Sequence, residues 1–218
     1  MPEKSQPLIV AIDGPAASGK STVAKRVAAR LGLIFVNSGA MYRAFTFHTL
    51  QSDVDPSETE SVLDLLAQTE FQSGKREGIG TIAVNGTELT AVQLSSPEVN
   101  DHVSIIAKIP EVRERLVAEQ RKYGAESGAG VVMEGRDIGS VVFPDSPHKF
   151  YIDASPEVRA QRRRDQGIDD EIEKRDRVDS SRKTAPLKIA EDAQVIDTSA
   201  MEIDEVVEKI LENFPSER

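Results

Sequence analysis

The chain has 218 residues, of which 39% are hydrophobic and 29% charged, and a net charge of −10, as expected of a globular protein with one substantial domain. The acidic balance argues against general nucleic-acid binding, because phosphate contacts favour a basic surface, and the absence of cysteine excludes disulfides, thiolate nucleophiles and cysteine-ligated metals. No segment reaches the roughly 18 apolar residues of a membrane span, and the N-terminus has no long apolar signal core, which together predict a cytoplasmic protein without membrane contact.

The first predicted element is a buried strand in the apolar, β-branched run PLIVAIDG, residues 7–14. It leads into GPAASGKS, residues 14–21, which fits the phosphate-binding pattern G-x-x-x-x-G-K-[ST]. The run after it places Val23, Val27 and Leu31 four residues apart, as in an amphipathic helix, with Gly32 as the stop. A glycine-rich loop between a strand and a helix lets backbone N–H groups converge on phosphate oxygens, and therefore predicts a nucleoside triphosphate site. The predicted ATP-binding residues are Gly14, Pro15, Ala16, Ala17, Ser18, Gly19, Lys20, Ser21 and Thr22.

Two side chains of this loop have predicted roles in the chemistry. Lys20 would reach the β- and γ-phosphates, and the Ser21 hydroxyl would ligate Mg²⁺. Asp13, directly before the loop, has two open interpretations: it could orient water around Mg²⁺, or it could be a structural turn residue.

Four further apolar runs predict parallel strands at residues 33–36, 131–133, 150–152 and 195–196. Helical patterns separate most of them, such as SPEVRAQRRR, in which Ser155 is a predicted N-cap and Pro156 the first helical residue. Strands that alternate with helices predict an α/β fold with a five-stranded parallel sheet covered on both faces. The last helical pattern predicts a core-facing stripe of Ile203, Val206, Val207, Ile210 and Leu211.

Residues 52–99 break the alternation of strands and helices. A short helical pattern is followed by polar and β-like runs, and Asn85-Gly86 between TIAV and TEL is a strong hairpin signal. We expect one core domain, residues 1–51 and 100–218, with a helix-plus-antiparallel-strand insertion at 52–99. The insertion is either a surface decoration or a functional lid or substrate clamp.

Polar stretches follow the second and third predicted strands. Ser38 and Arg43 come after the second strand, and Arg136 and Asp137 after the third. Ligands of open α/β sheets lie beyond the carboxyl ends of the strands, so these residues should converge near the glycine-rich loop. A lone arginine could serve a solvated surface or an ion pair, but several at one sheet edge predict a clamp for a second phosphate-bearing molecule.

The order of these motifs resembles that of the bacterial-type cytidylate kinases, in the nucleoside monophosphate kinase group of P-loop kinases. The resemblance covers nearly the whole chain and rests on IDGPAASGKST, VNSGAMYRA, EGRDIGSVVFPD, FYIDASPEVRAQRR, RDRVDSSRKTAPL and VIDTS. It implies a P-loop kinase core, a monophosphate-binding insertion and a short helical lid at about 156–176. It also implies phosphoryl transfer from ATP to CMP, and to dCMP, by a monomer whose partners are nucleotides.

The resemblance assigns roles to individual residues. Arg43, Arg136 and Arg182 would bind the monophosphate; Asp179 with Arg175 would bind the sugar hydroxyls; and Ser104, Arg113 and Asp137 would read cytosine. The implied CMP-binding residues, with Ser38 added from the same motifs, are Ser38, Arg43, Ser104, Arg113, Arg136, Asp137, Arg175, Asp179 and Arg182. The basic stretch KRDRVDSSRK, residues 174–183, would then grip the sugar and phosphate of CMP.

The implied catalytic residues are Lys20, Arg136, Arg162 and Arg163. Arg162 and Arg163 are the preferred pair, ahead of Arg159, to close over the transferring phosphoryl group, although the same run could form a solvated basic helix face. The stretch between Arg164 and Lys174 is shorter than in many relatives, which leaves open which lid arginine contacts the phosphoryl group.

Two further residues depart from the family pattern: Glu134 stands where an aspartate is frequent, and Ser140 where a threonine is common.

The alternative function is that of another nucleoside monophosphate or small-metabolite kinase on the same core. A regulatory GTPase would need an N-K-x-D guanine reader, and the chain contains no Asn-Lys dipeptide. The intact Lys20 and Ser21 argue against a catalytically silent nucleotide-binding regulator.

Overall fold

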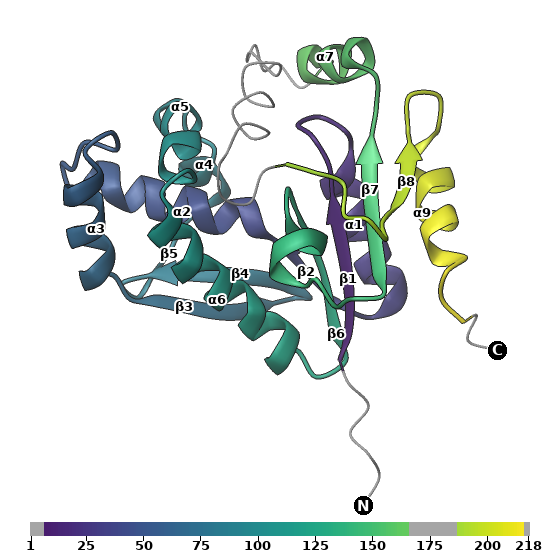
Figure 1. The fold of residues 1–218 in the computed structure, drawn as a ribbon, viewed down its shortest axis with the longest axis horizontal. Helices are drawn as coiled ribbons and strands as arrows, with labels where there is room; N and C mark the ends of the chain where they lie inside the picture. The colour runs from purple at the N-terminus through teal and green to yellow at the C-terminus, as the bar shows by residue number, and fades with distance from the viewer. Residues whose placement is uncertain (1–6, 166–186, 216–218) are drawn as a thin grey trace, which may run out of the picture.

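One sheet of eight strands runs through the chain, and the computed structural model describes residues 7–165 and 187–215 of it. The strands lie in the order β3-β4-β2-β6-β1-β7-β8, with β5 paired to β4 (Figure 1). Their bounds are β1 Leu8–Asp13, β2 Ile34–Asn37, β3 Phe71–Arg76, β4 Ile79–Val84, β5 Thr87–Glu88, β6 Gly130–Gly135, β7 His148–Asp153 and β8 Gln194–Asp197.

The five strands β2, β6, β1, β7 and β8 are parallel neighbours, which confirms the predicted five-stranded parallel sheet. β1 lies at its centre, with Asp13 opposite Gly135 of β6 and Tyr151 of β7. Residues 10–12 of β1 are fully buried, as a strand covered on both faces must be. The carboxyl ends of these strands therefore meet at one edge, the place where α/β sheets bind ligands.

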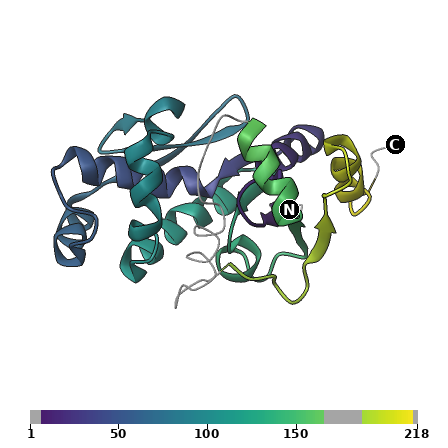
Figure 2. The ribbon, with the colours of Figure 1, turned by 90° about the horizontal axis from the view of Figure 1, so that it is seen from above.

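Helices cover both faces of the sheet (Figure 2). Successive residues of β1 point to opposite faces: Val10 and Ile12 pack with α1 and α9, whereas Ala11 packs with α2 and α6. The helices are α1 Lys20–Leu31, α2 Ser38–Gln51, α3 Thr59–Gln68, α4 Ala91–Leu94, α5 Pro97–Ile106, α6 Pro110–Glu126, α7 Pro156–Asp165 and α9 Ile203–Leu211. A π-helical turn, η1, spans Ile138–Val142. None of these helices is long and apolar enough to cross a bilayer.

The predicted helix boundaries around the phosphate-binding loop and in α7 are confirmed. Gly32 ends α1 in the left-handed conformation, with φ 65°. The Ser155 hydroxyl accepts from the Val158 amide at 3.3 Å, as an N-cap does.

The apolar stripe of α9 is narrower than predicted. Val206, Val207 and Ile210 are buried and Leu211 packs against the same core cluster, but Ile203 is 37% exposed. Ile203 is exposed because it is the first residue of the helix. Exposed ion pairs such as Arg30–Glu208 border the contact between α9 and α1.

Residues 52–99 contain the predicted hairpin, with Asn85 and Gly86 at φ 49° and 76° between β4 and β5. The sequence did not indicate that β4 would also join the main sheet. Phe35 of β2 pairs in parallel with Ile79, so the hairpin strands extend the sheet at the end opposite α9 (Figure 1). Phe71 and Val84 belong to the same core cluster as Met133 of β6, so the segment shares the hydrophobic core of the parallel strands.

Candidate active site

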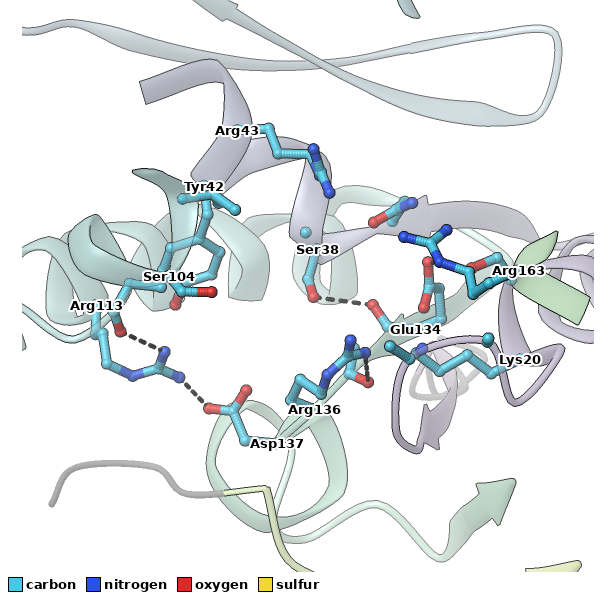
Figure 3. Close-up of a pocket in the computed structure, with 18 residues that line it drawn as sticks. Lys20, Ser38, Tyr42, Arg43, Ser104, Arg113, Glu134, Arg136, Asp137 and Arg163 are labelled. Atoms are coloured by element: carbon cyan, nitrogen blue, oxygen red, sulfur yellow. Dashed lines mark hydrogen bonds and ion pairs between the residues drawn. The ribbon is translucent and has the colours of Figure 1, made fainter. Parts of the chain in front are cut away.

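A cleft opens beyond the carboxyl ends of β1, β2 and β6 (Figure 3). Its lining brings together residues from the loop after β1, the start of α1, the ends of β2 and β6, the turn after β6, and the helices α2, α5, α6 and α7. The lining residues are Ala16, Ala17, Lys20, Ser21, Asn37, Ser38, Gly39, Tyr42, Arg43, Val103, Ser104, Ala107, Arg113, Glu134, Gly135, Arg136, Asp137 and Arg163.

The loop after β1, residues 14–19, has the backbone that its two glycines allow. Gly14 has φ 154°, and a Cβ there would lie 2.1 Å from the carbonyl oxygen of Ile152 in β7. Gly19 has φ 89°, in the left-handed region, directly before α1 begins at Lys20. Both positions require glycine, because any side chain would be strained or would clash with the neighbouring strand.

Cationic side chains bind the carbonyl groups of this loop. In a trans peptide the C=O and the N–H of the following residue point in opposite directions. When cations hold the carbonyl groups on one side of the loop, the N–H groups of the following residues therefore point to the opposite side. This arrangement prepares the loop to present N–H groups to an anion. The four pairs are Arg136–Gly14 (3.0 Å), Lys20–Pro15 (2.9 Å), Arg159–Ala16 (3.2 Å) and Arg162–Ser18 (3.1 Å).

The two preferred lid arginines lie in different surroundings. Arg163 lines the cleft. Arg162 donates to Ser18 O and also to the hydroxyl and carbonyl of Thr198, at 3.1 and 2.9 Å, and does not line the cleft. A phosphoryl contact by Arg162 therefore stays a prediction, one that requires its guanidinium to leave these partners.

Ser21 lies beside a carboxylate at the end of the cleft that the glycine-rich loop forms. Its Oγ donates to Glu134 Oε1 at 2.9 Å, and Glu134 is buried at the end of β6. Among residues 7–165 and 187–215 no group of three or more His, Asp or Glu side chains could hold a metal. One hydroxyl and one carboxylate nevertheless fit Mg²⁺, which keeps several waters and takes few protein ligands. The sequence did not assign Glu134 to the site, although its place at a strand end beside the glycine-rich loop was a usable signal.

A buried ion pair marks the opposite end of the cleft. Arg113 of α6 and Asp137 after β6 form it, with side chains only 3% and 8% exposed. Arg113 also donates to Ala107 O at 3.2 Å, and its guanidinium lies 5.3 Å from the centre of the Tyr42 ring. Ser104 of α5 lines the same end (Figure 3). Tyr42 was not predicted; its spacing of four residues from Ser38 on one helix was the signal.

Guanidinium groups lie between the two ends. Arg43, Arg136 and Arg163 lie around one space, with Lys20 at its border (Figure 3). Arg43 donates to Leu94 O at 2.9 Å and to Asn100 Oδ1 at 2.7 Å, which holds it at the rim. The Ser38 hydroxyl donates to Glu134 O at 2.9 Å and so joins the start of α2 to β6. The cleft thus has the glycine-rich loop of residues 14–19 at one end, cationic side chains in the middle and the buried Arg113–Asp137 pair at the other.

Three predicted residues lie outside the described ranges: Arg175, Asp179 and Arg182. The same holds for the basic stretch 174–183 and for the lid beyond residue 165.

Comparison with known proteins gives one consistent result. A family model described as "Cytidylate kinase" matches residues 10–216. The chain is 44% identical to a cytidylate kinase of Geobacillus kaustophilus, over 93% of this chain and 94% of the relative, and 43% identical to one of Bacillus subtilis, over 94% and 95%. In fold it is similar to an unliganded sugar kinase of Janibacter sp. HTCC2649, with a TM-score of 0.52, 16% identity and coverage of 94% and 93% of the two chains. The chain belongs to the cytidylate kinase family.

Proposed function

We propose that this chain transfers the γ-phosphoryl group of ATP to CMP and dCMP, giving ADP and CDP or dCDP. The observation that carries the proposal is the buried Arg113–Asp137 pair, which lies in the same cleft as the phosphate-binding loop but at its other end. Such an arrangement suits two nucleotides that meet phosphate to phosphate, with the acceptor base at the ion pair.

At the donor end, the amides of residues 14–19 and the N-terminus of α1 would bind the ATP phosphates. Lys20 is buried and donates to Pro15 O, so its ammonium group is held beside the loop that would bind the phosphates. Ser21 and Glu134 would hold Mg²⁺, which neutralises charge on the β- and γ-phosphates when bound.

In the middle of the cleft, Arg43 and Arg136 would bind the phosphate of the acceptor. Arg163 would face the transferring group. The attacking oxygen belongs to a phosphate and is already anionic, so the reaction needs alignment and charge neutralisation more than a general base. Guanidinium groups suit this task, because they stay charged and bind phosphate through two parallel hydrogen bonds.

At the acceptor end, the hydrogen-bonding groups match cytosine. Asp137 and Ser104 can accept from the N4 amino group, while Arg113 donates to N3 and O2. Uracil carries a carbonyl at C4, which would face the Asp137 carboxylate and leave two acceptors opposed in a buried site. A buried mismatch of this kind costs about 1–3 kcal/mol, which predicts a preference for CMP over UMP.

We further propose that residues 52–99 form part of the acceptor site and are no mere surface decoration. Leu94 of this segment accepts a hydrogen bond from Arg43, so the segment helps to hold a guanidinium of the cleft. A monomer would suffice for the reaction, because side chains from a single chain line both ends of the cleft.

The test is a coupled assay of ADP release with CMP, dCMP, UMP, AMP and GMP as acceptors. We expect CMP to give the highest kcat/KM and dCMP to follow, with UMP at least about tenfold lower. A preference for AMP or GMP would overturn the assignment of the acceptor and favour the alternative of another nucleoside monophosphate kinase.

A further inference from the structure

Asp13 is a buried carboxylate that none of the roles above uses. It is the last residue of β1, directly before Gly14, and is 5% exposed. Its Oδ1 accepts from the Ile138 amide and its Oδ2 from the Gly139 amide, both at 2.8 Å. Asp13 does not line the cleft, and both of its oxygens are directed to backbone N–H groups. The structure therefore favours a structural role over the orientation of water around Mg²⁺.

The two amides that Asp13 binds are the first two of η1, the turn that begins after Asp137. The first amides of a helical turn have no partner within the turn, and an aspartate at the N-cap position ordinarily accepts from them. Asp137 occupies that N-cap position, but its side chain makes no capping bond and is paired with Arg113 instead. Asp13 supplies the missing cap from a different strand.

A reciprocal bond ties the same two segments. Arg136 donates to Gly14 O at 3.0 Å, so residues 13–14 and residues 136–139 exchange three hydrogen bonds. The turn also lies close to its neighbours, since a Cβ on Gly139 would come within 3.2 Å of the Lys149 side chain. The end of β1 and the start of η1 therefore form one unit that carries the phosphate-binding loop on one side and Asp137 on the other.

We infer that Asp13 is a positioning residue of the acceptor site: by capping η1 in place of Asp137, it keeps the Asp137 carboxylate directed to Arg113, the position from which it would contact the acceptor base. The inference rests on the proposed function, in which Asp137 reads cytosine. Without the external cap, the first two amides of η1 would lack an acceptor. Asp137 occupies the N-cap position of this turn, from which an aspartate can accept from such amides, and its carboxylate would then turn away from Arg113 and the base.

The test is Asp13→Asn, which keeps the size of the side chain but presents an NH₂ group to one of the two amides. We expect the ratio of kcat/KM for CMP over that for UMP to fall about tenfold, mainly through a higher KM for CMP, while KM for ATP changes less than about twofold. A loss of general stability alone would lower the amount of active enzyme and leave both KM and the ratio unchanged.

Ser146→Ala is the matched control. The Ser146 hydroxyl donates to Ile9 O at 2.7 Å, so it too ties β1 to the segment after β6, but at the end of the strand away from the cleft. We expect this variant to lose stability and to keep the CMP-to-UMP ratio. If Asp13→Asn also keeps the ratio and the KM for CMP, Asp13 does not position the acceptor site.

Failure of the inference can be told from failure of the proposed function, because the wild-type chain runs in the same assay. A wild-type chain that does not prefer CMP overturns the proposed function, whereas a wild-type preference that Asp13→Asn shares overturns only the inference. Should Asp13→Asn not fold, amide hydrogen exchange of the wild-type chain decides: Ile138 and Gly139 should exchange as slowly as amides of β1, and exchange at loop rates would refute the cap.

Discussion

Substitution of Asp137 by Asn tests the recognition of the acceptor base with little change in shape. The Arg113–Asp137 pair is buried, so its hydrogen bonds lie in surroundings of low polarity, where a lost charge or a mispaired group has its full effect. An Asn side chain can turn its amide, presenting oxygen to the cytosine amino group or NH₂ to the uracil carbonyl. The preference for CMP over UMP should therefore fall by about 1–3 kcal/mol, or about 5- to 150-fold.

The assay is coupled ADP release, with kcat/KM measured for CMP and UMP on the same preparation. Unfolding is followed in parallel, because Arg113 loses its anionic partner and the variant should be less stable, by up to about 3 kcal/mol. Asp192→Asn is the control: Asp192 pairs with buried Lys149 at 2.8 Å and does not line the cleft. Its CMP-to-UMP ratio should equal that of the wild type. An unaltered ratio in Asp137→Asn would refute the contact between Asp137 and the base.

Three further predictions concern the donor end and Asp13. Lys20→Ala should lower kcat at least about 100-fold with little change in the affinity for CMP measured by calorimetry, because only the donor phosphates lose a cation; normal turnover would exclude a phosphoryl role. Glu134→Gln should raise the Mg²⁺ concentration needed for half-maximal activity about tenfold, and an unchanged Mg²⁺ dependence would remove Glu134 from the metal site. Burial raises the pKa of Asp13 from 3.8 to about 7, and the Asp137 charge makes a smaller contribution in the same direction. Hydrogen bonds from the Ile138 and Gly139 amides and the charge of Lys20 lower this pKa, but their effect is smaller. The folded state therefore binds this proton more tightly than the unfolded state. The free energy of unfolding of the wild type, relative to that of Asp13→Asn, should fall by up to about 1.4 kcal/mol per pH unit as pH rises from 5 to 7 and level off above. A difference between the two proteins that stays constant with pH would contradict the raised pKa.

The parts of the fold that depend on local sequence were predictable. The strands of the parallel sheet appear as short apolar runs, and the phosphate-binding loop as two glycines at fixed spacing, because burial on both faces and unusual backbone angles each restrict residue type directly. The hairpin at Asn85-Gly86 was predictable for the same reason.

Several features that depend on contacts between distant residues were not predictable. Nothing in the run around Ile79 indicates that it pairs with Phe35 of β2. Arg162 belongs to a run of arginines, and only the structure shows that Thr198 and Ser18 hold it while Arg163 lines the cleft. Asp13 kept two interpretations for the same reason, since the amides that it caps lie 125 and 126 residues further along the chain.

The most direct measurement of the central claim is a crystal structure of the chain with CMP and a non-hydrolysable ATP analogue bound together. The account predicts the triphosphate on residues 14–21, the CMP phosphate among Arg43, Arg136 and Arg163, and the cytosine amino group within hydrogen-bond distance of Asp137. A CMP molecule bound elsewhere, with Asp137 still paired to Arg113 and the three arginines directed to solvent, would contradict it.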